Sequence, residues 1–322
     1  VYTYYEYNVE LITHEVTFDT DGGSEMEPVK GNSNTILELP TPPTKEGYVF
    51  AGWYSDKERK ERYDWRFMYT IRRNFTLYAS WIKDNVDKAS AEKNFNFTEK
   101  TDDYGEKCYT IAAKDIEVID KNVVLPNNYN GIIVREVEED AFRDSGITSL
   151  YVPNSYTDIR ESAFFGCEQL SEVIFEDGSQ MEYLTSGVFG NCISLKSINI
   201  PDSIKVIRSN VFLRCINLET VNLPSNLYSI NTDAFYGCSA LKSITLPKSC
   251  VSVLQNAFYG CTQLSTFIVP EDTALTTIYA SALEGTAVTE IKLPYILKED
   301  NPFKDTDISV TFYDKIETEE EK

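Results

Sequence analysis

The stretch "LYSINTDAFYGCSALKSITLP" (Leu227–Pro247) holds one complete copy of the pattern that governs most of this chain. Two apolar residues stand eight and five positions before Phe235, a cysteine follows it by three positions, and a leucine follows the cysteine by three. The stretch closes on "SITLP", where polar and apolar residues alternate as in a strand with one buried face. A proline is tolerated at such a strand end. The copy therefore predicts a turn, a buried aromatic and a short strand.

This pattern recurs at intervals of 22 to 25 residues along the chain. The aromatic slot is occupied by Phe142, Phe164, Phe189, Phe212, Phe235 and Phe258, and then by Leu283. Apolar residues in fixed slots predict a solenoid, because a single coil cannot bury its apolar side and must stack on its neighbours. We expect a mainly β solenoid of about seven or eight coils.

The two ends of the repeat array depart from the pattern, as terminal coils that face water should. The cysteine slot holds Ser145 in the first coil and Thr286 in the seventh. Residues 301–314 resemble a shortened last coil, and residues 95–134 form the expected leading cap, with a turn at Asn130-Gly131. The acidic residues 315–322 are expected to form a tail.

The chain divides into two differently organised parts. Residues 82–94 are polar, lack strand alternation and are interpreted as a linker. We expect a β module over 1–81, with its core at 16–81, and a solenoid over 95–314. Residues 1–12 alternate well enough to predict a strand.

The consensus LxxIxLPxxLxxIxxxAFxxC resembles the BspA-like class of bacterial leucine-rich repeat over about Val123–Asp314. The resemblance implies a right-handed leucine-rich repeat solenoid. It also implies an exported bacterial protein, secreted or displayed on the cell surface, that acts in adhesion or protein binding. We therefore expect the chain to be a piece of a longer protein whose export signal and surface anchor lie elsewhere.

The N-terminal part resembles the Listeria–Bacteroides repeat, also called the internalin B-repeat. The resemblance rests on "VTFDTDGG" (Val16–Gly23), "PPTKEGYVFAGWYSD" (Pro42–Asp56), "YDW" (Tyr63–Trp65) and "NFTLYASW" (Asn74–Trp81). It implies a small β-grasp-like module that serves as a stalk or interaction unit. The charged run Lys57–Arg62 departs from the family, and we expect it on an exposed loop.

The residues of this module support the same interpretation. Asp21-Gly22-Gly23 between alternating apolar residues predicts a hairpin turn. Trp53, Trp65 and Trp81 supply large apolar surfaces for a domain too small to have a deep core.

The charge of the chain, −21 at pH 7, argues against nucleic acid and anionic membrane surfaces as partners. It favours a well-solvated monomer. No apolar run approaches the roughly 20 residues of a membrane helix, so we expect no membrane insertion in this piece. One histidine, His14, leaves little material for Ser-His or Cys-His catalysis. We expect a protein that is not an enzyme and has no cofactor.

Five cysteines share one slot of the repeat and form what we call the cysteine column: Cys167, Cys192, Cys215, Cys238 and Cys261. A zinc site needs ligands that converge, whereas a column is a line, and no CxxC pair occurs. Disulfides between neighbouring coils are compatible with the spacing of strands, but five cysteines leave one over. A nucleophile would not be repeated five times. We favour the fourth alternative, small apolar residues packed beside the phenylalanines.

The remaining candidate for function is a surface. Residues that alternate with the inward Ile and Leu of each strand should form two rows along one side of the solenoid, which we call the strand face. The first row is Ser149, Glu172, Ser197, Thr220, Ser243, Thr266 and Glu290. The second row is Tyr151, Ile174, Asn199, Asn222, Thr245, Ile268 and Lys292.

Solenoids commonly bind ligands on such a face, and the apolar residues Tyr151, Ile174 and Ile268 indicate contact with a partner. We therefore expect a protein ligand bound at the strand face. A glycan ligand and an inert spacer role remain alternatives, the former because the rows are rich in Ser, Thr and Asn.

Overall fold

A computed structural model describes residues 12–32, 35–66, 71–85, 88–117 and 119–314. The strand expected in residues 1–12 and the acidic tail at 315–322 therefore lie outside the described residues, save for Ile12. The chain forms two compact units. The N-terminal unit comprises residues 1–85, 99–109 and 128–133, and the solenoid unit comprises residues 86–98, 110–127 and 134–322. The domain limits and the linker at 82–94 stay predictions.

The N-terminal unit contains a four-stranded mixed sheet in the order β2-β1-β4-β3. Its strands are β1 (His14–Asp19), β2 (Val29–Gly31), β3 (Tyr48–Tyr54) and β4 (Phe75–Lys83). The two central strands, β1 and β4, run parallel, and each edge strand runs antiparallel to its neighbour. The predicted small β module is therefore confirmed, and no α-helix occurs in the described part of the chain.

The turn that follows β1 has the predicted chemistry. Asp21 and Gly22 both adopt positive φ values, 48° and 82°, and the Gly23 N–H donates to the Thr20 carbonyl at 3.0 Å. Two consecutive positive φ values define a type I′ turn, which favours Asp-Gly. The core of the sheet centres on Trp53, which is fully buried, while Trp65 and Trp81 pack against it half-buried.

The expectation that Lys57–Arg62 is an exposed loop is wrong at its last residue. The Arg62 side chain is only 9% exposed. Its guanidinium pairs with Asp102 at 2.7 Å and with Glu106, and it stacks over the Tyr104 ring at 4.4 Å. These partners are distant in sequence, so the local charge density of the run suggested exposure where the fold provides a buried ion pair.

A further sheet has the order β11-β9-β6-β5, and β8 pairs with β9. Its strands are β5 (Phe95–Thr101), β6 (Lys107–Ala113), β8 (Asn128–Tyr129), β9 (Ile132–Val137) and β11 (Asp158–Ile159). A 3-10 helix, η1 (Glu92–Asn94), precedes β5. The predicted turn joins β8 to β9, with φ values of 52° at Asn130 and 80° at Gly131.

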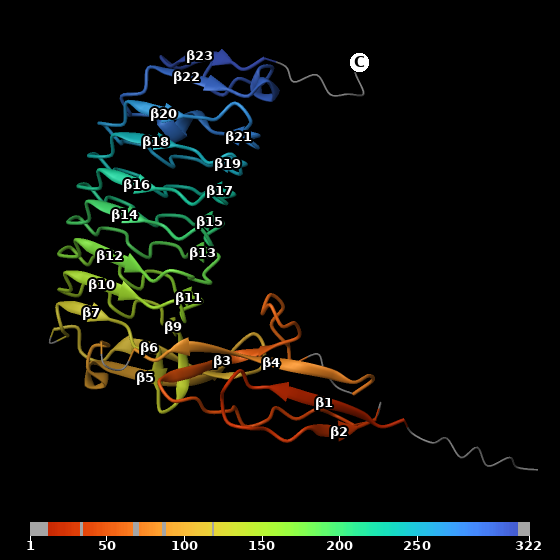
Figure 1. The fold of residues 1–322 in the computed structure, drawn as a ribbon. Helices are drawn as coiled ribbons and strands as arrows, with labels where there is room; N and C mark the ends of the chain where they lie inside the picture. The colour runs from red at the N-terminus through yellow and green to blue at the C-terminus, as the bar shows by residue number, and fades with distance from the viewer. Residues whose placement is uncertain (1–11, 33–34, 67–70, 86–87, 118, 315–322) are drawn as a thin grey trace, which may run out of the picture. The chain divides into compact units, whose positions relative to one another are not determined.

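The solenoid unit carries nine short strands that follow one another along one side, as Figure 1 shows. They are β7 (Asn122–Val124), β10 (Ser149–Val152), β12 (Glu172–Phe175), β14 (Ser197–Asn199), β16 (Thr220–Asn222), β18 (Ser243–Thr245), β20 (Thr266–Ile268), β22 (Glu290–Leu293) and β23 (Ser309–Phe312). The predicted solenoid is confirmed, with nine rungs in the described residues where about seven or eight coils were expected. The extra rung is β7, which lies in the predicted cap and lacks the Phe and Cys signature.

Two-residue strands form a second ladder on another side of each coil. Besides β11, they are β13 (Tyr183–Leu184), β15 (Val206–Ile207), β17 (Ser229–Ile230), β19 (Ser252–Val253) and β21 (Thr277–Ile278). All their pairings are parallel and in register, for example Ile207 with Ile230. The apolar slot five residues before each phenylalanine therefore points into the core, as the repeat predicts.

The phenylalanines of the repeat form a continuous column inside the solenoid. From Phe142 to Phe258 each ring stacks on the next, with centroids 4.9–6.0 Å apart and planes tilted by 2–18°. All six are fully buried. Phe95 closes the first end of the column with its ring edge against Phe142 at 6.3 Å.

The last coils are simpler than the central ones. Leu283 ends the 3-10 helix η2 (Ala280–Leu283), and Phe303 occupies the following aromatic slot fully buried. Between β22 and β23 the chain forms η3 (Tyr295–Leu297). No two-residue strand pairs with β21 from this coil in the described residues. This shortening is what the sequence analysis expects of residues 301–314.

Candidate ligand-binding face and neighbouring sites

The two predicted rows lie on the nine-strand side of the solenoid, where strand pairing holds them in register within four short sheets: β7-β10-β12, β14-β16, β18-β20 and β22-β23. Ser149 pairs with Glu172 and Tyr151 with Ile174. Asn199 pairs with Asn222, and Thr245 with Ile268. Residues two apart on one strand point to the same side, so each pairing extends both rows by one step.

Burial separates these rows from the residues between them. Ile198, Ile244 and Phe267 are buried, whereas their neighbours on the same strands are exposed. Ile174 and Ile268 are 43% and 47% exposed, so the second row presents apolar side chains to solvent at both ends of its middle section. Ser149 and Tyr151, on β10, are half-buried.

Hydrogen bonds connect successive rungs of the rows. The Asn222 amide donates to the Asn199 carbonyl oxygen across the strand pair. The Ser149 hydroxyl donates to the Asn122 side chain at 3.0 Å. Tyr151 is half-buried and bonds to Glu176, and the pKa of its phenol is raised, first by burial and then by that carboxylate. Tyr151 is therefore held in place as a hydrogen-bonding aromatic at one end of the face.

The middle of the strand face is uncharged. Four consecutive rungs, β14 to β20, present only eight residues in the two rows: Ser197, Asn199, Thr220, Asn222, Ser243, Thr245, Thr266 and Ile268. Charges begin outside them, at Glu172 on one side and at Glu290 and Lys292 on the other. A chain with a net charge of −21 thus presents a neutral, hydrogen-bonding strip along this face.

The cysteine column lies behind this surface, wholly inside the solenoid. All five thiols are free and fully buried. Each sulfur contacts the carbonyl oxygen of a phenylalanine in the preceding coil: Cys167 that of Phe142 (3.1 Å), Cys192 that of Phe164 (3.4 Å), Cys215 that of Phe189 (3.1 Å), Cys238 that of Phe212 (3.1 Å) and Cys261 that of Phe235 (3.1 Å). Each of these carbonyls also accepts from the backbone N–H three residues later, so the thiol adds a second contact to an acceptor inside the core.

This environment is unsuited to thiolate chemistry. Burial raises the pKa of Cys215 to about 12 and that of Cys167 to about 11. Because the thiolate is the reactive form, these groups are inert near neutral pH. Among the described residues, no three or more His, Cys, Asp or Glu side chains are arranged to hold a metal ion.

The other two cysteines also pack in cores. Cys250 occupies the slot that holds Leu227 in the preceding coil, as the repeat predicts, and it is fully buried. Cys108, which the repeat does not assign, lies in the N-terminal unit against Val49, Ala51 and Ile133.

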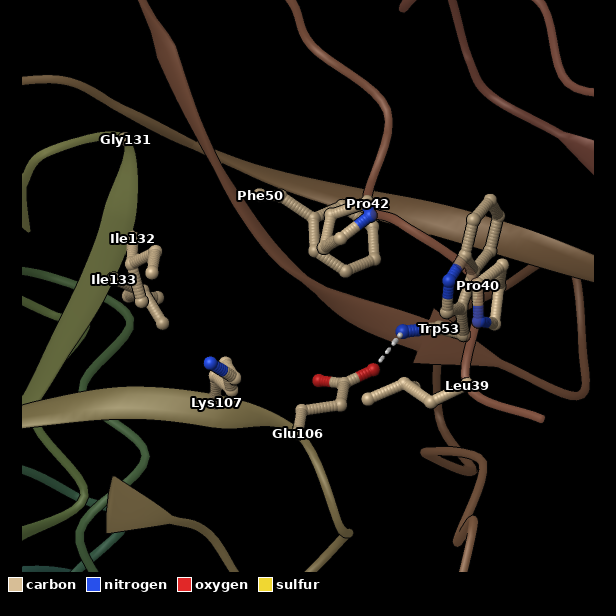
Figure 2. Close-up of a pocket in the computed structure, with 10 residues that line it drawn as sticks. All are labelled: Leu39, Pro40, Pro42, Phe50, Trp53, Glu106, Lys107, Gly131, Ile132 and Ile133. Carbon is tan, nitrogen blue, oxygen red and sulfur yellow. Dashed lines mark hydrogen bonds between the residues drawn. The ribbon is translucent and has the colours of Figure 1, made fainter. Parts of the chain in front are cut away.

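The sequence analysis misses a pocket in the N-terminal unit. The pocket encloses about 110 Å³ and is lined by Leu39, Pro40, Pro42, Phe50, Trp53, Glu106, Lys107, Gly131, Ile132 and Ile133. Figure 2 shows Pro40, Pro42 and Phe50 on one side, Ile132 and Ile133 on the other, and Glu106 and Lys107 along the base. Three parts of the chain that are far apart in sequence form it, residues 39–53, 106–107 and 131–133, so no local motif could have indicated it.

Glu106 is the acidic group of this pocket and is held firmly. One carboxylate oxygen accepts from the Trp53 backbone N–H at 3.1 Å (Figure 2). The other accepts from the Arg62 guanidinium. Gly52 makes this arrangement possible, because a Cβ there would lie 2.6 Å from Arg62 Nε and 2.8 Å from Glu106 Oε2.

Comparison with known families assigns both units. Residues 120–217 and 182–307 match the profile of the BspA type leucine rich repeat region. Residues 14–80 match the Listeria-Bacteroides repeat domain. Both resemblances drawn from the sequence are thereby confirmed.

Relatives with similar sequence align with the N-terminal part. A membrane protein of Evansella cellulosilytica is 42% identical over 85 residues, which are 26% of this chain and 12% of that protein. Internalin H of Listeria monocytogenes is 36% identical over 73 residues, 23% of this chain and 13% of internalin H. The chain thus spans only a small part of the relatives it matches.

Among solved structures, the leucine-rich repeat protein of T. pallidum is similar, with a TM-score of 0.57 and 25% identity. The alignment covers 69% of this chain and all of that one. Within the described ranges, no helix is long and apolar enough to cross a bilayer.

Proposed function

Because this chain belongs to the BspA-type leucine-rich repeat family, we propose that it is a non-enzymatic bacterial surface or secreted protein that binds a protein ligand through its strand face. Leucine-rich repeat proteins generally mediate protein interactions, which supports the class of partner. The N-terminal Listeria-Bacteroides repeat fits the role of a stalk or second interaction unit.

The neutral strip from β14 to β20 carries this proposal. Its side chains are exposed, are held in register by strand pairing within β14-β16 and within β18-β20, and offer donors and acceptors without charge. A rigid surface binds with little loss of conformational freedom, so a partner does not have to order it. The exposed Ile174 and Ile268 add apolar area at either end, as in interfaces with apolar contacts and polar hydrogen bonding. An uncharged strip also selects against partners that require charge complementarity.

Site-specific photo-crosslinking tests this surface. A benzophenone side chain at Asn222 on the strand face is expected to capture a partner from solubilised cell-surface proteins. The same group at Thr232, in a turn outside both ladders, should not capture a partner.

Arginines at Asn199, Asn222 and Thr245 together are expected to abolish capture by a probe at Ser243, with the circular dichroism spectrum unchanged. Arginines at Ser209, Thr232 and Gln255 are the matched control. Capture that survives the first set, or is lost equally with the second, contradicts the proposal.

A glycan ligand is the second candidate, favoured by the Ser, Thr and Asn side chains of the rows. A sugar ring commonly stacks on an aromatic face, and the only aromatic residue of the two rows is Tyr151, which is half-buried and bonded to Glu176. A glycan array signal that is lost in Tyr151→Ala, without any protein crosslink, would establish this alternative.

A further inference from the structure

We propose that the pocket of the N-terminal unit binds an alkylammonium group, with the alkyl stem between the apolar walls and the charge at Glu106. This site is separate from the strand face, and the inference goes beyond the proposed function. The alkylammonium group would come from a lysine side chain of a polypeptide or from a free aliphatic amine, since both offer the same chemistry.

The base of the pocket supplies the anionic group. Glu106 is only 6% exposed, yet its carboxylate lines the pocket. A carboxylate has about four acceptor positions. The Trp53 N–H and the Arg62 guanidinium occupy two of them, and Arg62 is shared with a second carboxylate, Asp102. Glu106 can therefore accept further hydrogen bonds from a cation.

The neighbouring lysine does not fill this role. Lys107 lines the pocket, but its ammonium pairs with Glu99 at 2.7 Å and its side chain is 64% exposed. Its charge is therefore directed to the surface, away from Glu106. The pocket gains the apolar stem of this lysine as part of its wall.

The walls suit an alkyl chain that carries a positive charge. Pro40, Pro42, Ile132 and Ile133 offer aliphatic surface, and Phe50 adds an aromatic ring on the same side as the prolines (Figure 2). A cation near an aromatic face is attracted by the ring quadrupole, more strongly where water is excluded. A volume of about 110 Å³ accommodates one unbranched side chain rather than a larger ligand.

Other ligand classes fit less well. An anion would meet the Glu106 carboxylate at the base, and like charges in a water-poor site repel strongly. A purely apolar ligand would cover Glu106 without providing a donor, which leaves a charged group desolvated and incompletely paired. A primary ammonium provides three donors and a positive charge to the same group.

Titration of the full chain with small probes tests the site. N-acetyl-lysine methylamide and n-butylammonium represent the two sources, and N-acetyl-norleucine methylamide is the neutral isostere of the first. Chemical shifts of the Trp53 backbone N–H, which bonds to Glu106, report occupancy of the pocket.

Both cations are expected to bind at least about tenfold more tightly than the norleucine derivative, because charge-assisted hydrogen bonds are stronger than neutral ones. A polypeptide source predicts that the lysine derivative binds more tightly than n-butylammonium, and a free amine predicts the reverse. Equal binding of lysine and norleucine, or no saturable shift with either cation, overturns the proposal.

Two variants locate the charge. Glu106→Gln is expected to remove the preference for lysine over norleucine, since an amide keeps the shape but not the charge. Lys107→Met, at an exposed side chain that leaves Glu106 in place, is expected to bind both cations about two- to threefold more tightly by removing a like charge. If Glu106→Gln does not fold, Lys107→Met decides alone. A folded Glu106→Gln protein that still prefers lysine, or a Lys107→Met protein that binds cations no more tightly than the native chain, contradicts the site.

Discussion

The two units reach stability in opposite ways. In the solenoid the central coils repeat the same few contacts: a phenylalanine on a phenylalanine and a sulfur on a carbonyl. In the N-terminal unit the decisive contacts occur once each, such as Arg62 between Asp102 and Glu106 beside Gly52. A repeated contact can be replaced by its neighbours in part, whereas a unique one has no substitute. The comparison therefore predicts graded damage in one unit and abrupt damage in the other.

The largest expected loss of stability comes from a substitution at the centre of the phenylalanine column. Phe235→Ala removes a fully buried ring stacked on Phe212 at 5.0 Å and on Phe258 at 5.1 Å. We expect a loss of about 4 kcal/mol in the free energy of unfolding of the solenoid, as for other buried phenylalanines. Urea unfolding followed by far-UV circular dichroism measures it. Phe303→Ala, in the last coil, should cost less because it has fewer neighbours, and equal costs would show that the column is not the cooperative unit.

A single methyl group should break the N-terminal unit. Gly52 has a φ of 123°, and a Cβ there would overlap the buried Arg62–Glu106 pair. Gly52→Ala is therefore expected to cost about 3 kcal/mol or more. Tryptophan fluorescence reports this unit selectively, since Trp53, Trp65 and Trp81 all lie in it. Gly47→Ala is the control: its φ is 72° but nothing lies within 4 Å of the added methyl, so only about 1 kcal/mol is expected. If the two substitutions lowered the free energy of unfolding equally, the cause would be backbone strain alone and not overlap with the Arg62–Glu106 pair.

Alkaline pH should weaken the solenoid through its thiols. Burial raises the pKa of Cys215 to about 12 from the ordinary thiol value of 9.0. A folded-state pKa above the unfolded one means that the stabilisation is complete below pH ~9 and is lost as the pH rises toward ~12, because only the unfolded state readily releases the proton. At pH ~10.5 the contribution lost is on the order of 2 kcal/mol for this thiol. Between pH ~8 and ~10.5 the free energy of unfolding of Cys215→Ser, measured by urea titration, should therefore fall by less than that of the native chain. Parallel pH curves for the two proteins would contradict the assignment.

The smallest expected effect concerns a place where the repeat deviates from itself. Arg214 has a φ of 56° in the slot that holds Gly166, Gly237, Gly260 and Gly285 in other coils, all at positive φ. Arg214→Gly should stabilise the solenoid by roughly 0.5–1 kcal/mol, because relief of backbone strain exceeds the added freedom of the unfolded chain. Lys196→Gly, at an exposed residue without a positive φ, should destabilise it instead. A melting-temperature comparison distinguishes the two signs.

The periodic part of the molecule was predictable because its information is local and repeated. The phenylalanine slot, the inward Ile and Leu of each strand and the registered rows all follow from one coil copied along the chain. The Asn130-Gly131 and Asp21-Gly22 turns were predictable for another reason, since their backbone demands residues that tolerate positive φ. Strand β7 was not counted as a rung because it lacks the aromatic signature that marks the others.

The unique part was not predictable. Arg62 stands in a run of charges, and nothing near it in sequence points to Asp102 or Glu106. The pocket needs three distant parts of the chain to meet, and the sulfur–carbonyl contacts depend on the offset between neighbouring coils. The half-buried position of Tyr151 against Glu176 was not predictable either. It depends on the path of the chain at the end of β10, which the alternation of polar and apolar residues does not specify.

The direction of the sulfur contacts has a consequence for synthesis. Each cysteine of the column reaches back to a phenylalanine carbonyl that precedes it by 25 to 28 residues, never forward. A chain that emerges from its amino end thus meets each acceptor before the matching thiol appears. Every new coil can therefore form its sulfur contact on arrival, without waiting for a later coil to be made.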